Sequence, residues 1–260
     1  MKEYKSELFG LIPEPESFGE LIEILTLYKE PNSNVHMWRG QINIGWRVDH
    51  SAYRRLKIKK DKINDFDLVW YEQSLMKQAT HRGFRRQNTW NLSDLELLAK
   101  LQHHGAATRL IDFSRNSFIA LWFAVSENLN LNGILIGLNS DYLGGHESTS
   151  QNYDYPFELK KVDNTEHPYT FEPPVITPRI AAQHSQFVYS SLSFEKTGSL
   201  KLHENKDANI FISIKKELKS EIANILERSF DLRLGTLFPD IDGFGDANSH
   251  LISTDKMWRW

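Results

Sequence analysis

The sequence predicts one α+β domain in which a split, antiparallel sheet is flanked by helices and preceded by a helical N-terminal portion. Apolar residues recur at helical spacing in several segments, and short apolar runs with strand-like patterning lie between them. The chain has 260 residues, of which 40% are hydrophobic, so it can bury one sizeable core. No internal repeat, low-complexity tract or linker divides it.

The N-terminal part of the chain predicts a helix, a loop and a strand in turn. Ser17 and Glu20 form a capping box, which predicts an amphipathic helix that ends near Lys29. Polar residues 31–34 form a loop, and Val35–Gln41 is expected to be a short strand that delivers Arg39. A glycine directly after this arginine would let a ligand or another backbone approach closely.

The stretch from Leu98 to Val125 places polar residues between two apolar runs. Ser93 followed by Glu96 is a second capping box, so a helix begins there and Gly105 is expected to end it in a left-handed turn. A second helix runs to Val125. Polar groups this dense beside apolar residues must be hydrogen-bonded or form a site, because each unpaired burial costs a few kcal/mol. These residues are Gln102, His103, His104, Thr108, Arg109, Asp112 and Ser114.

The remainder of the chain predicts three strands and one long helix. Residues 133–138, 187–194 and 210–214 are expected to be strands, and Glu217–Phe230 is expected to be an amphipathic helix. The polar, proline-containing segment 139–175 is interpreted as a long loop of functional or insertional origin. Phe238–Gly243 is interpreted as a turn, and the last residues as a short helix that ends in Trp258 and Trp260.

Charge and composition restrict the classes of function. The net charge is −3, so bulk electrostatics do not favour a polyanion, and the chain has no cysteine for thiolate chemistry or disulfides. The first residues carry no apolar signal region, and no run approaches the ~18 apolar residues of a membrane span. We therefore expect a cytoplasmic protein with no membrane partner.

Two basic clusters interrupt this slightly acidic chain. Residues 51–60 carry five basic side chains and no acid, and residues 77–86 carry four Lys or Arg plus His81. A long helix with apolar positions at Phe66, Val69, Trp70 and Leu75 is expected between them. The clusters could be solvated helix faces, or they could bind a nucleic acid. The residues that would make the nucleic-acid contacts are Arg54, Arg55, Lys57, Arg82, Arg85 and Arg86.

The motif residues combine three kinds of ligand-binding chemistry. Arg39 and Arg109 suit bidentate recognition of a phosphate or carboxylate. Neutral hydrogen-bonding side chains suit sugar hydroxyls, and aromatic rings could stack a planar base. The neutral groups are Gln41, Gln102, Thr108 and Gln183, and the aromatic residues are Trp38, Phe113 and Phe187. Phosphate, ribose and base together indicate a nucleotide, and NAD is a candidate that needs neither a metal nor a thiol.

Several familiar site chemistries are missing from the sequence. It has no P-loop, no Gly-x-Gly-x-x-Gly after a strand and no Gly-x-Ser-x-Gly elbow. His103 and His104 are adjacent, so on a helix they point about 100° apart and cannot easily share one metal. His103 with Asp112 could be a base and its orienting carboxylate. Alternatively, Asp112 is structural, because it pairs with Arg109 or caps the helix that begins near Ser114.

Four segments resemble the FRG domain family. Residues 102–114, QHHGAATRLIDFS, are similar to its central motif, and Trp38-Arg39-Gly40 matches its namesake motif. An Arg-x-x-x-Gln segment at Arg179 and Gln183, followed by Phe187, and the turn at 238–243 complete the resemblance. Ala107 and Ser185 depart from the residues usual in the family. The resemblance implies an N-terminal helical extension over 1–34 and an FRG domain over 35–260.

A more distant resemblance is to the ADP-ribosyltransferase fold, in which an Arg or His on the first strand, often followed by Gly, holds NAD. Thr108 to Ala124, which ends in ALWFA, is similar to its Ser/Thr-containing segment and following helix. A later strand usually supplies a catalytic glutamate, but this chain has Gln183 and Gln186 there. The resemblance implies an NAD-using enzyme, an ADP-ribosyltransferase or NAD glycohydrolase, that modifies nucleic acid or protein. The resemblance to FRG-domain proteins also implies a toxin or phage-defence role, in which the protein could have a protein partner such as an antitoxin.

On this basis the sequence assigns catalytic roles to His103, Arg109 and Gln183. Cofactor contacts are expected from Trp38, Arg39, Gly40, Gln41, Thr108 and Phe187, and no metal is expected. One alternative is a nuclease, metal-dependent or metal-free, that uses His103, Asp112, Asp240 and Asp242. The other is a non-catalytic module that senses a nucleotide or a partner protein.

Overall fold

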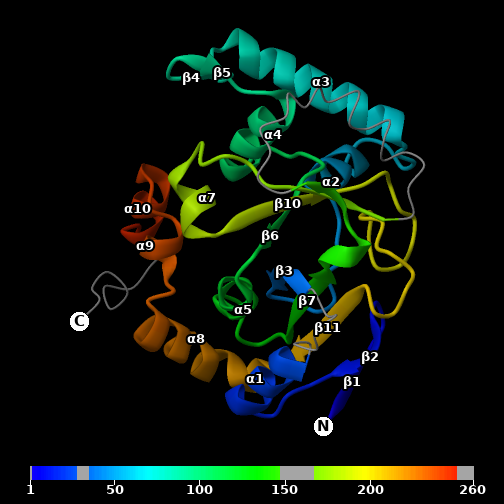
Figure 1. The fold of residues 1–260 in the computed structure, drawn as a ribbon, viewed down its shortest axis with the longest axis vertical. Coiled ribbons are helices and arrows are strands. Elements are labelled where there is room, and N and C mark those ends of the chain that lie inside the picture. The colour runs from blue at the N-terminus through cyan, green and yellow to red at the C-terminus, as the bar shows by residue number, and fades with distance from the viewer. Residues whose placement is uncertain (1, 28–34, 147–166, 251–260) are drawn as a thin grey trace.

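A curled seven-stranded sheet forms the centre of the protein (Figure 1). The computed structural model describes residues 2–27, 35–146 and 167–250. The strand order is β11-β7-β3-β6-β10-β9-β8, and every neighbouring pair is antiparallel except β8 and β9. The strands are β3 (Val35–Gln41), β6 (Ile111–Ser114), β7 (Gly133–Asn139), β8 (Gly144–His146), β9 (Tyr169–Phe171), β10 (Ser185–Tyr189) and β11 (Asn209–Ile214). The predicted α+β class with a largely antiparallel sheet is confirmed.

The sheet is split between β3 and β6. These two strands share a single pair in register, Trp38 with Ser114, whereas β3 pairs along most of its length with β7. Helix α5 (Ser117–Val125) packs against β3 near this split. At Gly40 a Cβ atom would lie 1.8 Å from the carbonyl oxygen of Ala120, so only glycine lets the helix approach this closely.

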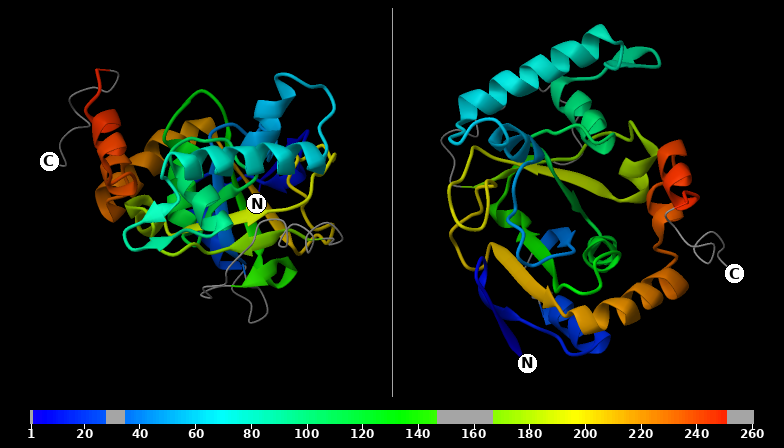
Figure 2. Two further views of the ribbon diagram at one scale, coloured as in Figure 1. Left: turned by 90° about the horizontal axis from the view of Figure 1, so that it is seen from above. Right: turned by 180° about the vertical axis from the view of Figure 1, so that it is seen from behind.

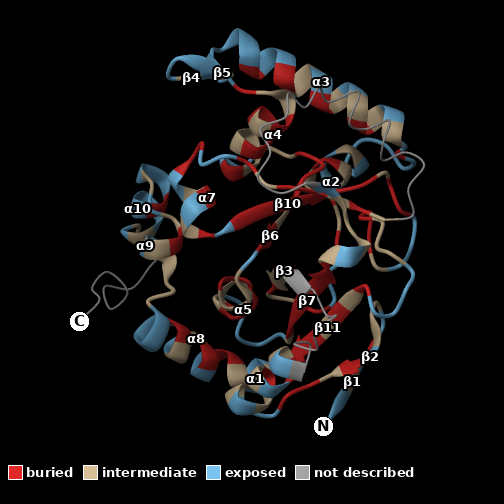
Figure 3. Cartoon of the chain, viewed as in Figure 1, coloured by how far each residue is buried: buried red, intermediate tan, exposed pale blue. Residues whose placement is uncertain are grey.

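Helices cover the two halves of the sheet separately. Helices α1 (Phe18–Leu27), α5 and α8 (Lys216–Phe230) share a core with β7 and β11. Helices α3 (Asp65–His81), α4 (Asp94–His103) and α7 (Pro178–Ala182) share another core with β9 and β10, and the short α2 (Ser51–Lys57) packs against α3. Figure 2 shows α3 at the edge of the molecule, and Figure 3 shows the buried residues concentrated in the sheet and on the inner helix faces.

The N-terminal portion contains a hairpin that the sequence did not predict. Strands β1 (Glu3–Ser6) and β2 (Gly10–Pro13) pair antiparallel before helix α1, and β2 packs against β11. Leu21 and Ile24 of α1 are fully buried in the core with α5 and α8. The N-terminal residues therefore belong to the core that α1 shares with α5 and α8, and they do not form a purely helical extension.

Other predicted elements need smaller corrections. The predicted loop 139–175 contains η1 (Ser140–Tyr142), β8 and β9, and its residues 147–166 lie outside the described residues. The predicted strand 187–194 is β10, which ends at Tyr189. The predicted turn 238–243 joins α9 (Leu234–Leu237) to α10 (Ile241–Ala247), and Asp240 caps α10. A small hairpin, β4 (Arg86–Gln87) with β5 (Trp90–Asn91), follows α3. The predicted C-terminal helix at 251–260 lies outside the described residues.

Candidate functional site

A cavity of about 530 Å³ opens where the sheet splits. It is lined by β3, β6, α4, α5 and α7 together with the α9–α10 segment near the C-terminus. Segments that are far apart in the sequence therefore meet at one place. The polar lining residues are Arg39, Gln102, His103, His104, Asp112, Ser114, Arg179, Gln183, Asp242 and Asp246, and the aromatic ones are Trp38, Phe113, Phe123 and Phe238.

Arg39 bridges the gap between the two halves of the sheet. Its Nη1 donates to the backbone oxygen of Asp112 at 2.8 Å, and its Nε donates to Oε1 of Gln41 at 3.2 Å. Burial lowers the pKa of Arg39, the carboxylate of Asp112 opposes this shift, and the positive charge of Arg54 adds to it. Among the described residues, no carboxylate oxygen lies within 4.0 Å of its guanidinium. The cavity wall therefore holds a fixed cation that does not form a direct ion pair.

Asp112 presents its carboxylate to the same cavity. Its Oδ2 accepts a hydrogen bond from Nε2 of Gln102 at 2.9 Å, and Oε1 of Gln102 in turn accepts from Oγ1 of Thr108 at 2.9 Å. The prediction that Asp112 caps the next helix or pairs with Arg109 is wrong. Asn116 caps α5, through hydrogen bonds from the backbone nitrogens of its first turn.

His103 lies at the end of α4, between the cavity and the core. Its Nδ1 is 3.1 Å from Oγ1 of Thr177, and its ring packs on that of Phe187 with centroids 5.4 Å apart. Burial lowers the pKa of His103, the carboxylate of Asp112 opposes this shift, and the nearby Arg179 adds to it. The lowered pKa favours the neutral imidazole, and Nε2 has no hydrogen-bond partner among the described residues.

Arg179 fastens the C-terminal helices to the cavity rim. Its Nε and Nη2 pair with both carboxylate oxygens of Asp240, and its Nη1 donates to the backbone oxygen of His103 at 2.9 Å. The guanidinium carbon lies 4.9 Å from the centroid of the Phe238 ring. The Arg179 hydrogen bonds lower the pKa of Asp240 to about 2. Arg179 was not included among the predicted site residues. Its spacing of four from Gln183 could have indicated it, because residues four apart on a helix lie on the same face.

Gln183 joins the same rim. Its Nε2 donates to the backbone oxygen of Leu237 at 2.9 Å, and its own backbone oxygen accepts from Oγ of Ser114 at 2.7 Å. Gln183 thus ties α7 both to α9 and to the end of β6. Gln186, the other glutamine of this segment, is fully buried and donates to Oγ1 of Thr170, away from the cavity.

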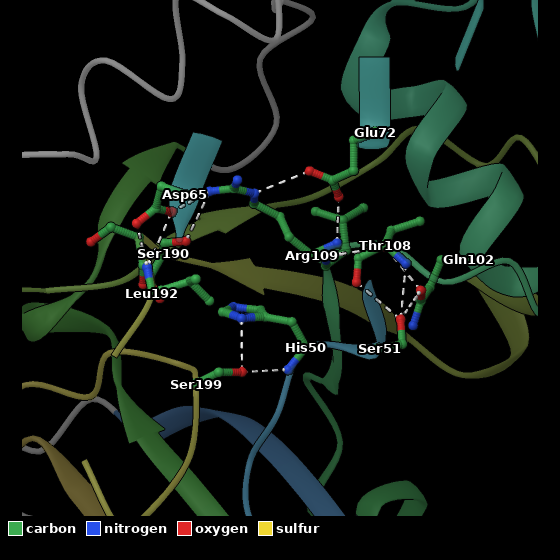
Figure 4. A network of polar contacts seen from close by, with 12 residues as sticks. His50, Ser51, Asp65, Glu72, Gln102, Thr108, Arg109, Ser190, Leu192 and Ser199 are labelled. Atoms are coloured by element: carbon green, nitrogen blue, oxygen red, sulfur yellow. Dashed lines mark hydrogen bonds and ion pairs between the residues drawn. The ribbon is translucent and has the colours of Figure 1, made fainter. Parts of the chain in front are cut away.

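Arg109 is not at the cavity, contrary to the sequence-based prediction. It is 1% exposed and forms ion pairs with Glu72 at 3.1 Å and Asp65 at 3.3 Å, and it also donates to the backbone oxygen of Ser190 (Figure 4). The chain turns between Thr108 and Leu110, so the side chain points under α3 instead of into the split. Arg109 thus connects α3 with the segment after β10.

The other predicted contact residues divide into lining and supporting roles. Trp38, Arg39 and Gly40 line the cavity. Gln41, Thr108 and Phe187 are buried behind it, where they contact Arg39, Gln102 and His103 respectively. The nuclease alternative requires Asp240 and Asp242. Asp240 forms an ion pair with Arg179, and the carboxylate of Asp242 lies 3.5 Å from Nδ1 of His104 at the exposed rim. Within the described ranges, no three potential ligand side chains are grouped to hold a metal.

These features define an α+β domain with a polar cavity at the split of its central sheet. Residues 34–132 match the model of the FRG domain family. The match runs from β3 through α5, and it includes Arg39, Gln102, His103 and Asp112. Arg179 and Gln183 lie outside it. Comparisons with curated proteins and with solved structures gave no match. None of the helices described is long and apolar enough to cross a membrane.

Proposed function

We propose that the cavity binds NAD and that the protein transfers ADP-ribose from it to a macromolecule. The observation that carries this proposal is the position of Arg39 and Asp112 on the two strands at the split, where Arg39 donates to the backbone oxygen of Asp112 and both side chains line the cavity. A fixed guanidinium without a direct carboxylate partner suits a phosphate, and a carboxylate beside it suits the ribose.

The cavity is suited to a dinucleotide in size and lining. Its volume of about 530 Å³ falls within the ~300–1,000 Å³ range of small-molecule sites. Phe123 and Phe238 are only half-buried, so their faces can stack a planar ring. The amides of Gln102 and Gln183 add neutral hydrogen-bonding groups for hydroxyls or a carboxamide.

In the proposed reaction the bond between nicotinamide and the ribose C1′ breaks, and nicotinamide leaves with the bonding electron pair. Asp112 would stabilise the positive charge that develops on the ribose. The folded protein already holds the carboxylate in place, so no reorganisation is needed at the moment of reaction. A hydroxyl or amine of the acceptor then bonds to C1′ and gives its proton to neutral His103. Asp112 would thus fill the role that the resemblance placed at Gln183 and Gln186.

Two broader interpretations depend on the same pocket. A non-catalytic module that senses a nucleotide would need the Arg39 contacts but no turnover. A role as a toxin or phage-defence effector, with an antitoxin as partner, is implied only by the family resemblance. The sensor can be separated from the transferase by following the two ends of the NAD molecule.

The test uses the full chain with NAD labelled either in nicotinamide or in adenine, together with lysate protein and RNA. Adenine label on a macromolecule and release of nicotinamide support the transferase. Release of nicotinamide without macromolecular label identifies an NAD glycohydrolase. Calorimetry with NAD and ADP-ribose completes the test, because binding without turnover identifies a sensor, and no binding of either compound overturns the proposal.

A further inference from the structure

One wing of the molecule concentrates positive charge. Residues 54–91, which include most of α2, all of α3 and the β4–β5 hairpin, carry ten Lys or Arg and four Asp or Glu, a net charge of +6. The whole chain has a net charge of −3, so the rest of the protein carries −9. Two of the four acids, Asp65 and Glu72, are already paired with Arg109. The wing is therefore a local cationic surface on an acidic protein.

The outer face of α3 carries exposed aromatic side chains within this surface. Phe66 is 75% exposed and Trp70 is 67% exposed, although large aromatic residues normally lie inside. The sequence had suggested that both were apolar positions of a packed helix. The buried face is made instead by Leu68, Glu72 and Met76. The two exposed rings are four residues apart, so they lie on one face about 6 Å apart along the helix axis.

The same face continues into polar and basic residues. Gln73, Lys77 and His81 follow Trp70 at spacings of three and four, and all three are exposed. They also line a shallow groove of about 490 Å³ together with Arg85, which forms an ion pair with Asp94 in the same groove. Lys77 has no ion-pair partner among the described residues. We call the row of Phe66, Trp70, Gln73, Lys77 and His81 the α3 stripe.

We propose that the α3 stripe binds a single-stranded nucleic acid. Exposed aromatic rings beside a lysine without an ion-pair partner are the chemistry that such strands require, because bases stack on the rings and phosphates contact the cation. A double-stranded nucleic acid offers phosphates but keeps its bases stacked, so the two rings would gain nothing from it. This site is separate from the cavity and does not depend on the proposed NAD reaction.

The experiment measures the anisotropy of a fluorescent twenty-nucleotide oligo(dT) and oligo(U) with the full chain at several salt concentrations. Phe66→Ala and Trp70→Ala should each weaken binding by about tenfold, since stacking on one aromatic side chain contributes on that order. Phe194→Ala is the matched control, because Phe194 is also 75% exposed but lies outside the wing. Lys77→Gln should reduce the salt slope by about 0.7, the value for one phosphate contact with a single strand, whereas Lys196→Gln should not.

Equal binding by wild type, Phe66→Ala and Trp70→Ala would overturn the proposal. The absence of oligonucleotide binding at low salt would overturn it as well. Competition by polyglutamate that is as effective as competition by unlabelled oligo(dT) would show an acidic-peptide surface instead. Because Phe66 and Trp70 are exposed, their alanine variants should fold, and circular dichroism confirms this before binding is measured.

Discussion

Arg109 and Glu72 form an ion pair that is almost fully buried, with side-chain exposures of 1% and 0%. Glu72 also accepts a hydrogen bond from the backbone nitrogen of Arg109. Burial raises the pKa of Glu72, and the interactions with Arg109 oppose that shift. The pair connects α3 to the strand that carries Asp112. The arginine of the central sequence motif thus supports the cavity from behind without lining it.

Removal of one partner of this pair should be costly for stability. Glu72→Ala is expected to lower the free energy of unfolding by about 3–5 kcal/mol, because it leaves Arg109 buried with less compensation. Urea denaturation followed by fluorescence measures the change. Asp242→Ala is the control, because the Asp242 carboxylate is 59% exposed and should have little effect. A Glu72→Leu, Arg109→Met double variant should recover much of the loss, and no recovery would argue against a pairing penalty.

Arg39 should determine nucleotide affinity. A charge-assisted hydrogen bond contributes about 1.5–3 kcal/mol, so Arg39→Ala is expected to weaken NAD or ADP-ribose binding by roughly tenfold to more than a hundredfold. Arg39→Lys keeps the charge but loses the planar donor pair, and should recover only part of the affinity. Calorimetry gives both values. Arg47→Ala is a control for lost charge, because the Arg47 side chain is 40% exposed and pairs with Asp49. Unchanged affinity in Arg39→Ala would remove Arg39 from the site.

Asp112 should affect turnover more than folding. Asp112→Asn keeps a hydrogen-bond acceptor for Gln102 but removes the negative charge, so nicotinamide release is expected to fall by about a hundredfold or more, the typical loss of one electrostatic contact in a transition state. Binding of ADP-ribose and the melting temperature should change little. Asp141→Asn, on an exposed residue outside the cavity, provides the comparison. A large drop in melting temperature would instead assign Asp112 to the fold.

Gly40 should tolerate no side chain. The Cβ of Gly40→Ala would meet backbone atoms of Ala120 and Ala124 of α5, so the variant is expected to lose several kcal/mol or to shift the helix into the cavity. Gly105→Ala offers a useful comparison, because its φ of 80° costs about 1–2 kcal/mol for an L-residue but no atom crowds the site. Thermal unfolding should place Gly40→Ala well below Gly105→Ala. Similar values for the two variants would contradict a close approach of α5.

His50 should make stability depend on pH. It is fully buried, and burial lowers its pKa from 6.5 to about 3, with a smaller contribution from Arg109. Since the unfolded chain binds a proton there between these values, stability should decrease as pH falls, by about 1.4 kcal/mol per unit below pH 6. His50→Asn should be less pH-dependent between pH 6 and 4.5, measured by urea denaturation at each pH. Equal slopes in both proteins would show that other groups determine the dependence.

The sequence by itself determined the fold class and most of the elements. Hydrophobic periodicity and capping boxes are local signals, so they located β3 with its Arg39, and also β7, β11, α4 and α8. The same reasoning was wrong for Phe66 and Trp70, which it placed on the packed face of α3 although both are exposed. Apolar residues at helical spacing predict a helix but do not reveal which of its faces packs against the protein. The hydrophobic pattern of the sequence also did not predict the β1–β2 hairpin.

Only the tertiary structure decided which polar residues share the cavity. Arg109 and Asp112 are three residues apart, yet one points under α3 and the other into the split sheet. Arg179 and Gln183 reach the cavity because α7 packs beside α4 and α9. Which buried polar groups become partners depends on contacts between residues far apart in the chain, and burial makes an unpaired group so costly that those distant partners determine each side chain's position.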